Sequence, residues 1–183
     1  MSMKKNNILL KDCCEIKAGG DKPKNFSKSK TDICTIPVYA NGIDNKGLVG
    51  FTDKAQILQK AITISARGST GAAFYRDKPY VPIIRLISII PNELIVDSKY
   101  LYYVLDNMNI KGIGSVQAQL TVPDIEKRSI CIFEDCDYQR KVADVLSSID
   151  TQIQRNEYMV HKLRLNDTTI SCFSTKGEMR HVA

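Results

Sequence analysis

Arg67 is the residue of this sequence best suited to reading a nucleic-acid base. It lies in the segment SARGSTG, whose glycines let the backbone approach a partner closely while the guanidinium forks onto a guanine or a phosphate. Ser69 and Thr70 of the same segment belong to the candidate DNA-binding set. Asn41 and Asn45 lie in the segment ANGIDNKG, and an amide side chain can pair with adenine through two hydrogen bonds. These two segments are therefore candidate base-reading loops.

Two glutamines add to this candidate set. Gln117 and Gln119 alternate along SVQAQL, so both would project to the same side of an extended segment. The alternative for each of these polar residues is a turn-stabilising or surface role that involves no ligand. For Asn41, which precedes Gly42, that alternative is the stronger of the two, because Asn before Gly is typical of tight turns.

The positive charge of the chain is concentrated near its N-terminus. Of the formal net charge of +6, residues 1–30 contribute eight lysines against three acidic groups, a net +5, mainly in the segment KAGGDKPKNFSKSK. Such a face attracts nucleic-acid phosphates through the release of counterions. A solvated, flexible basic loop is an equally good interpretation of the charge alone. The lysines assigned to DNA binding are Lys22, Lys24, Lys28, Lys30 and, in the ANGIDNKG loop, Lys46.

The sequence carries none of the motifs that would indicate catalysis. It has no Walker phosphate loop, because GK followed by Ser or Thr never occurs, and Gly42, Gly47 and Gly50 form no dinucleotide fingerprint. The only histidines, His161 and His181, lie in the C-terminal part, so no Ser-His-Asp set is credible. The six cysteines are scattered without a CxxC pair, which argues against a zinc site. We expect no cofactor, no metal and no catalytic role.

Length and hydropathy are those of one soluble domain with an appendage. The chain has 183 residues, of which 43% are hydrophobic and 25% charged. No apolar run approaches the roughly 20 residues that span a bilayer, and the start MSMKKNNILLKDCCEI lacks the apolar stretch of a signal peptide. We therefore expect a cytoplasmic protein with reduced thiols and no membrane association.

Short strand-like segments predict the fold of residues 1–135. Segments rich in Val, Ile, Thr and Tyr are separated by NG, NKG, RGSTG and PNE turn signals, which favours a curled, mostly antiparallel β-structure. One helix with Ser98 as its N-cap and an apolar face at helical spacing interrupts it, so the fold class is α+β. The expected strands are Thr35–Ala40, Leu48–Thr52, Ala61–Ala66, Val81–Ile90 and Ser129–Phe133.

A heptad pattern marks the C-terminal part of the chain. Steps of four and three residues give seven apolar positions out of nine, a narrow stripe typical of a coiled-coil seam that needs a partner helix. Asp137 would cap this helix, and Asn156 would favour one register. The expected organisation is a recognition domain over 1–135, a long dimerisation and spacer helix over 137–173 and a flexible tail over 174–183. The seam positions are Val142, Leu146, Ile149, Ile153, Asn156, Val160, Leu163 and Ile170.

Several motifs, in their order and spacing, resemble one half of a type I restriction-modification specificity subunit: a target recognition domain followed by its conserved helix. The resemblance covers about residues 9–165. Two features depart from the pattern. FEDCDYQ stands where a proline usually precedes the helix, and family members commonly carry two domains and two helices. The matching elements are Leu10, Asp12, Ile16, Gly19, Gly20 and Pro23; IPVYANGI at Ile36–Ile43; the RGSTG element at Ile64–Gly71; the helix at Tyr100–Leu105; GSVQAQLTVPDI; and the helix start at Gln139–Ile153.

The resemblance implies a non-catalytic specificity subunit that recognises double-stranded DNA. It implies three partners: an adenine methyltransferase subunit and a restriction subunit, both directed to a bipartite target, and a second copy of the chain or a related half-subunit, bound through the C-terminal helix. The competing interpretation is a coiled-coil scaffold whose head binds protein. A DNA reader would lose affinity steeply as salt rises, and a scaffold would not bind a duplex. An RNA-binding module is disfavoured because no exposed aromatic platform is evident.

Overall fold

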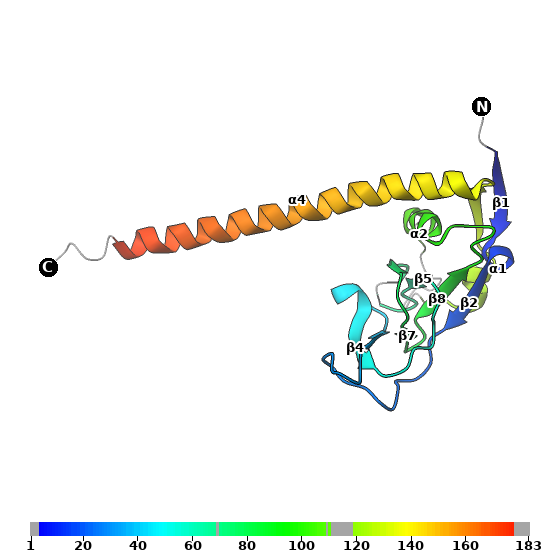
Figure 1. Ribbon diagram of the computed structural model, residues 1–183, viewed down its shortest axis with the longest axis horizontal. Coiled ribbons are helices and arrows are strands. Elements are labelled where there is room, and N and C mark those ends of the chain that lie inside the picture. The colour runs from blue at the N-terminus through cyan, green and yellow to red at the C-terminus, as the bar shows by residue number, and fades with distance from the viewer. Residues whose placement is uncertain (1–3, 69, 109, 111–118, 178–183) are drawn as a thin grey trace. The chain divides into compact units, whose positions relative to one another are not determined.

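The computed structural model has the α+β architecture expected from the sequence, with small, mostly antiparallel sheets and a long C-terminal helix (Figure 1). It describes residues 4–68, 70–108, 110 and 119–177, and for 164–177 only the helical backbone. The chain divides into two compact units, Met1–Ala143 and Asp144–Ala183. The first unit contains the sheets and the core, and the second contains most of the long helix.

A four-stranded antiparallel sheet forms the centre of the first unit. Its strands, in spatial order, are β2 (Cys14–Ala18), β8 (Ile87–Pro91), β5 (Ala61–Ile64) and β6 (Ala73–Arg76). The two central strands, β8 and β5, are buried along their whole length. Their sequences, ISIIP and AITI, are rich in β-branched residues, which pack well on a pleated surface.

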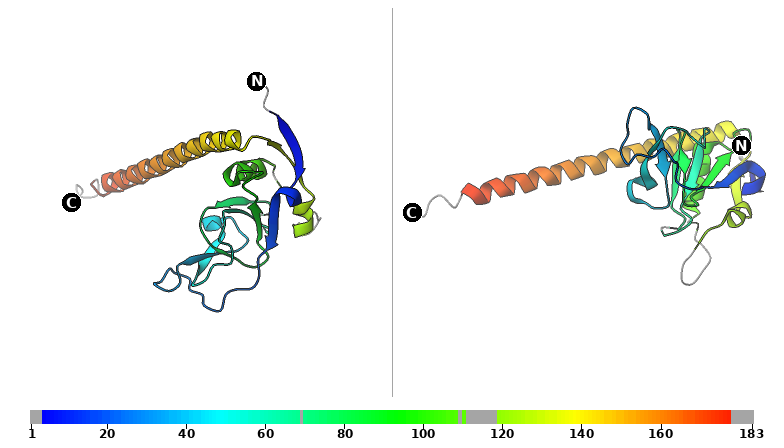
Figure 2. Two further views of the ribbon diagram at one scale, coloured as in Figure 1. Left: turned by 45° about the vertical axis from the view of Figure 1, so that its right-hand side comes forward. Right: turned by 90° about the horizontal axis from the view of Figure 1, so that it is seen from below.

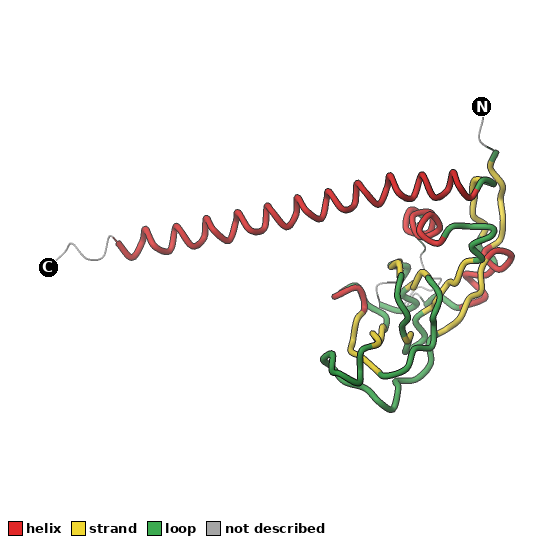
Figure 3. Tube along the Cα trace, viewed as in Figure 1, coloured by secondary structure: helices red, strands yellow, loops and turns green. Residues whose placement is uncertain are grey.

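A three-stranded sheet and a two-stranded ribbon complete the β-structure. In the sheet, β3 (Ile36–Tyr39) lies between β4 (Leu48–Thr52), which is antiparallel to it, and β7 (Val81–Pro82), which is parallel. In the ribbon, β1 (Lys5–Leu9) pairs antiparallel with β9 (Ser129–Phe133) and so joins the two ends of the first unit. Figure 3 shows that long loops connect these strands.

The main core packs helices against the four-stranded sheet. Helix α2 (Ser98–Asn107) contacts β5, β6 and β8 and buries Leu101 and Leu105. Two short helices, α1 (Leu10–Cys13) and α3 (Val122–Glu126), lie beside β2 (Figure 2). This packing removes the apolar face of each element from water, which is the main favourable contribution to folding.

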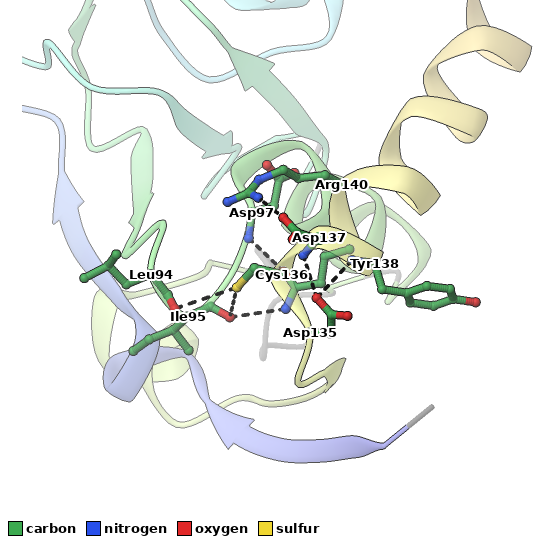
Figure 4. A network of polar contacts seen from close by, with 9 residues as sticks. Leu94, Ile95, Asp97, Asp135, Cys136, Asp137, Tyr138 and Arg140 are labelled. Carbon is green, nitrogen blue, oxygen red and sulfur yellow. Dashed lines mark hydrogen bonds and ion pairs between the residues drawn. The ribbon is translucent and has the colours of Figure 1, made fainter. Parts of the chain in front are cut away.

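The long helix α4 (Cys136–Gly177) has 42 residues without a break (Figures 1 and 3). Hydrogen bonds from the Gln139 side chain attach the first turn of α4 to the rest of the first unit. The fully buried amide of Gln139 donates to Phe133 O at 2.7 Å and to Ile95 O at 3.2 Å, and its Oε1 accepts from Asp97 N at 2.8 Å. The Cys136 thiol, close by in Figure 4, also donates to Ile95 O at 3.6 Å.

Both expected helix caps were wrong by one or two residues. Asp97, not Ser98, caps α2, because its Oδ1 accepts from Tyr100 N at 2.8 Å. Asp135, not Asp137, caps α4, because its Oδ1 accepts from the backbone N–H of Asp137 at 2.8 Å. Aspartate satisfies the free N–H groups of a first turn well, and both segments offer more than one candidate.

The expected strands β3, β4 and β9 are confirmed, the last two at their predicted bounds. The expectation of a single strand over Val81–Ile90 was wrong, because a turn at Ile84 and Arg85 separates β7 from β8. Strands β1, β2 and β6 were not predicted. Strands β1 and β2 pair with segments distant in sequence, so local pattern alone carried little sign of them, whereas β6 pairs with the strand directly before it, β5.

Candidate nucleic-acid interface

The side chain of Asn41 joins three loops of the first unit. Its Oδ1 accepts from the backbone N–H of Ala66 at 2.8 Å, and its Nδ2 donates to the carbonyl of Ile84 at 2.7 Å. The backbone N–H of the next residue, Gly42, donates to the hydroxyl of Ser65 at 3.1 Å. The loop after β3, the end of β5 and the turn before β8 therefore meet at one point, the Asn41 junction.

Arg67 follows directly on this junction and is exposed. Its Nη2 donates to Oε1 of Gln119 at 3.3 Å, so two residues that the sequence singled out lie side by side. The two segments are also held together by their backbones, because Leu120 N donates to Ala66 O at 3.0 Å. Both side chains keep further donors and acceptors for a ligand, since a guanidinium has five N–H groups.

Glycines shape the loop that carries Arg67. Gly68 and Gly71 both have positive φ, at 68° and 91°, which glycine adopts without strain. At Gly71 a Cβ would lie 1.6 Å from the carbonyl oxygen of Ile110, so no other residue fits. Thr70 is half-buried, and its hydroxyl donates to Gly68 O at 3.4 Å. Ser69 and Gln117, also in the candidate set, lie outside the described residues.

Asn45 and Lys46 lie exposed in the short helix η1 (Asp44–Gly47), which joins β3 to β4. Both have positive φ, at 47° and 53°. The backbone N–H of Ala40, next to Asn41, donates to Gly47 O at 2.9 Å, so this loop begins and ends beside the Asn41 junction. Asn tolerates the left-handed conformation better than most residues, whereas Lys46 needs support from outside the loop.

That support comes from Arg76, which the sequence analysis did not single out. Its Nη2 donates to the carbonyl of Lys46 at 2.5 Å, its Nε donates to the Thr63 hydroxyl at 3.0 Å, and its guanidinium stacks 3.6 Å from the ring centroid of Tyr39. Arg76 is only 5% exposed, and this burial lowers its pKa below the ordinary value. The ion pairs found among the described residues do not include it.

The lysine-rich segment is exposed but anchored along β4. Lys22, Lys24, Lys28 and Lys30 all face solvent. Between them, Ser27 exchanges two backbone hydrogen bonds with Phe51, of 2.9 and 2.8 Å. The Asn25 amide also donates to the Asp53 carboxylate at 2.6 Å, which lowers the pKa of Asp53.

The structure thus separates the candidate residues into two groups. Asn41, Arg67 and Gln119 gather at the junction, with Asn45 and Lys46 on the loop that starts there. The lysines lie along β4 toward its other end, where Asn25 O accepts from the Thr52 hydroxyl at 2.6 Å. Four of the five candidate lysines therefore lie apart from the hydrogen-bonding side chains at the junction, an arrangement that suits phosphate contact and base reading respectively.

Sequence reasoning also missed the turn at Ile84 and Arg85. Both residues are exposed and have positive φ, at 53° and 58°. The segment VPIIRLISII contains no Gly, Asn or Asp to signal a turn, and its apolar character is typical of a continuous strand.

Residues 4–160 match the family model of the type I restriction modification DNA specificity domain. The chain belongs to this family. Two relatives from Mycoplasma pneumoniae, S.MpnORF89P and S.MpnORF507P, bear the name of type I specificity subunits. They are 32% identical over 135 residues and 34% identical over 124 residues, which cover 74% and 67% of this chain. The matches cover 40% and 34% of those proteins, so this chain spans well under half the length of either relative.

Solved structures of the same family share the fold. The S subunit of a type I restriction-modification system from M. genitalium aligns with a TM-score of 0.69 at 17% identity, over 84% of this chain and 41% of its own. The HsdS subunit from Thermoanaerobacter tengcongensis aligns with a TM-score of 0.60 at 17% identity, over 82% of this chain and 38% of its own. The resemblance stated from the motifs is thereby confirmed at the level of family and fold.

Within the described residues, no helix is both long and apolar enough to cross a membrane. The same part of the chain holds no group of three or more His, Cys, Asp or Glu side chains placed to bind a metal ion.

Proposed function

We propose that this chain is a sequence-reading unit that directs a type I restriction-modification system to its DNA target and has no catalytic activity of its own. The observation that carries the proposal is the Asn41 junction. At this junction an exposed Arg67 and a half-buried Gln119 lie side by side, within a domain of the DNA specificity family. Arginine and glutamine are the side chains that form paired hydrogen bonds with guanine and adenine in the major groove.

The roles of the candidate residues follow from their surroundings. Arg67 and Gln119 contact base edges, because the bond between them uses only one of the five guanidinium N–H groups and the amide oxygen, so both side chains keep donors for a ligand. Asn45 and Lys46 contact the duplex from the adjacent loop. Asn41 acts mainly by positioning, since both ends of its amide already bind the backbone of neighbouring loops. Lys22, Lys24, Lys28 and Lys30 bind phosphates and orient the domain without specifying sequence.

Direct binding measurements test this function. The full chain is offered a pool of duplexes with a random core, and the enriched duplex is then titrated at several salt concentrations. We expect a defined enriched sequence and a steep linear fall of log affinity with log salt. Lys28→Gln is expected to weaken binding to all duplexes alike and to reduce that slope by about 1. Enrichment of no sequence would contradict the proposal and leave the scaffold interpretation, in which the head binds protein.

The pairing of two copies through α4 is the second part of the proposal. Ile149, Ile153 and Val160 are about half exposed, at 47%, 48% and 46%, and Leu163 is 61% exposed. Asn156 faces solvent among them, and Leu146 is half-buried. A helix with a continuous exposed apolar stripe gains stability from a partner. Val142 contributes instead to the core of the first unit, so the pairing seam starts at Leu146, and the Ile170 side chain lies outside the described residues.

Two paired copies would present two heads to two half-sites and so read a bipartite target. Light scattering on the full chain tests the pairing: we expect a dimer that Ile153→Asp converts to a monomer, while the off-seam control Tyr158→Ala remains dimeric. A wild-type monomer at high concentration would contradict self-pairing.

The partners would be an adenine methyltransferase subunit and a restriction subunit in the cytoplasm, which the family membership supports. Adenine methylation at the enriched sequence is the expected result when the chain is co-expressed with the methyltransferase of the same system. Unchanged methylation in a deletion strain would contradict this recruitment role.

A further inference from the structure

The turn at Ile84 and Arg85 has an unusual backbone. Both central residues have positive φ, at 53° and 58°, and Leu86 N donates to Ile83 O at 3.1 Å, as in a type I′ turn. Such positions normally carry Gly, Asn or Asp. A β-branched residue there is a genuine outlier, because its Cβ crowds the backbone.

The Ile84 side chain contributes little to the stability of the domain. Ile84 is 58% exposed, so most of its apolar surface stays in water. The backbone, not the side chain, holds the turn: Ile84 N donates to Gly20 O at 2.9 Å and Arg85 N donates to Gly19 O at 3.1 Å. Glycine or asparagine at position 84 would keep these bonds and fit the conformation better. A strained and exposed apolar residue is a signal of function rather than of stability.

The turn also belongs to the Asn41 junction. The Asn41 amide that donates to the Ile84 carbonyl at 2.7 Å accepts, at its other end, from the N–H of Ala66, the residue before Arg67. One side chain therefore fixes the turn relative to the loop that carries Arg67. Any duplex whose bases reach Arg67 would come close to the turn as well.

We propose that Ile84 is a specificity-determining residue that makes an apolar contact with a thymine methyl group in the major groove. The inference rests on the proposed function, which places Arg67 in the same groove. A duplex presents the C5-methyl of thymine there, and an apolar side chain is its natural partner. The turn holds Ile84 outward for this contact, and the exposed Arg85 beside it supplies a positive charge for a nearby phosphate.

The test is a double-mutant cycle between Ile84 and the methyl group. The full chain first selects its duplex from the random-core pool. Each thymine of that duplex is then replaced, one at a time, by deoxyuridine, which removes only the methyl. We expect one replacement to weaken wild-type binding about 4-fold, the effect of one buried methyl. The Ile84→Gly variant should bind the unmodified thymine duplex at least about 4-fold more weakly than the wild type does. Replacing the same thymine by deoxyuridine should not weaken the binding of this variant further.

The folding control makes the result unambiguous. Ile84→Gly and Ile84→Asn relieve the backbone strain, so their thermal midpoints should equal or exceed that of the wild type. Leu94→Asn is the matched surface control, because Leu94 is 89% exposed and follows the other end of β8. We expect it to bind the selected duplex as the wild type does.

The outcomes separate this inference from the proposed function. If the wild type selects a duplex but Ile84→Gly binds it equally well, the role of Ile84 is wrong and the proposed function stands. If Ile84→Gly binds weakly but every deoxyuridine effect persists in it, the methyl contact is wrong. If the wild type selects no duplex, the proposed function and this inference fall together.

Discussion

The Arg67 guanidinium donates to the side-chain oxygen of Gln119 at 3.3 Å, across 52 residues of sequence. Both residues lie at the surface end of the Asn41 junction, and the backbone bond from Leu120 N to Ala66 O fixes the two segments that carry them. Two side chains from separate segments, both proposed to read bases, are therefore held next to each other by side-chain and backbone hydrogen bonds.

Replacing Arg67 should separate recognition from stability. Because Arg67 is exposed, Arg67→Ala should change the free energy of unfolding by no more than about 0.5 kcal/mol. Affinity for the selected duplex should fall by about 10-fold or more, the value of a paired contact to a base. Arg67→Lys keeps the charge without the fork and should relax the preference for one base. Arg155→Ala on α4 serves as a charge-matched control, and equal losses for it and Arg67→Ala would refute the assignment.

Asn41 should matter for stability as much as for binding. Asn41→Ala leaves Ala66 N and Ile84 O without their partner, and we expect a loss of about 1–3 kcal/mol in the free energy of unfolding. Asn41→Asp keeps the acceptor for Ala66 N but loses the donor to Ile84 O, so its free energy of unfolding should lie between those of the wild type and Asn41→Ala. Chemical denaturation measures both, and a neutral Asn41→Ala would mean that water replaces these bonds without cost.

Arg76 is expected to hold the η1 loop in shape. Arg76→Met fills a similar volume but removes the bonds to Lys46 O and Thr63, which should cost about 1–3 kcal/mol of unfolding free energy. Arg76→Lys keeps the positive charge and cannot make both contacts at once, so it should also be destabilised. Hydrogen exchange should show faster opening at residues 44–47 in both variants. Unchanged protection there would contradict the anchoring role.

Tyr80 predicts a loss of stability at alkaline pH. Burial raises the pKa of Tyr80 to about 12, while its hydroxyl donates to Ser88 at 2.8 Å. An unfolded tyrosine ionises near 10, so between about pH 10 and 12 the unfolded state loses a proton that the folded state retains. The contribution of Tyr80 is therefore complete below pH 10 and disappears as pH rises toward 12.

Denaturant midpoints at pH 9 and pH 11 measure this effect. The drop between the two values should be smaller in Tyr80→Phe, which has no group to ionise. An identical drop in both proteins would assign the alkaline sensitivity to other residues, such as Tyr100, whose pKa burial also raises.

The sequence by itself determined the features that depend on local pattern. Turn signals and β-branched runs predicted β3, β4 and β9, and the heptad stripe predicted the long helix, because alternation and periodicity record which face of an element is apolar. The motif order around RGSTG identified the family. Arg67 and Gln119 were also candidates from residue type alone, although nothing local showed that they touch.

Only the tertiary structure decided how these parts meet. The turn at Ile84 depends on carbonyls of Gly19 and Gly20, far away in sequence, so VPIIRLISII carried no turn signal. Arg76 resembled a surface residue until the fold buried it against Tyr39 and Lys46. Asn41 became a junction because two distant loops brought a donor and an acceptor to its amide. Hydrogen bonds between segments distant in sequence impose conformations that the local sequence does not prefer, and the candidate interface is assembled from such bonds.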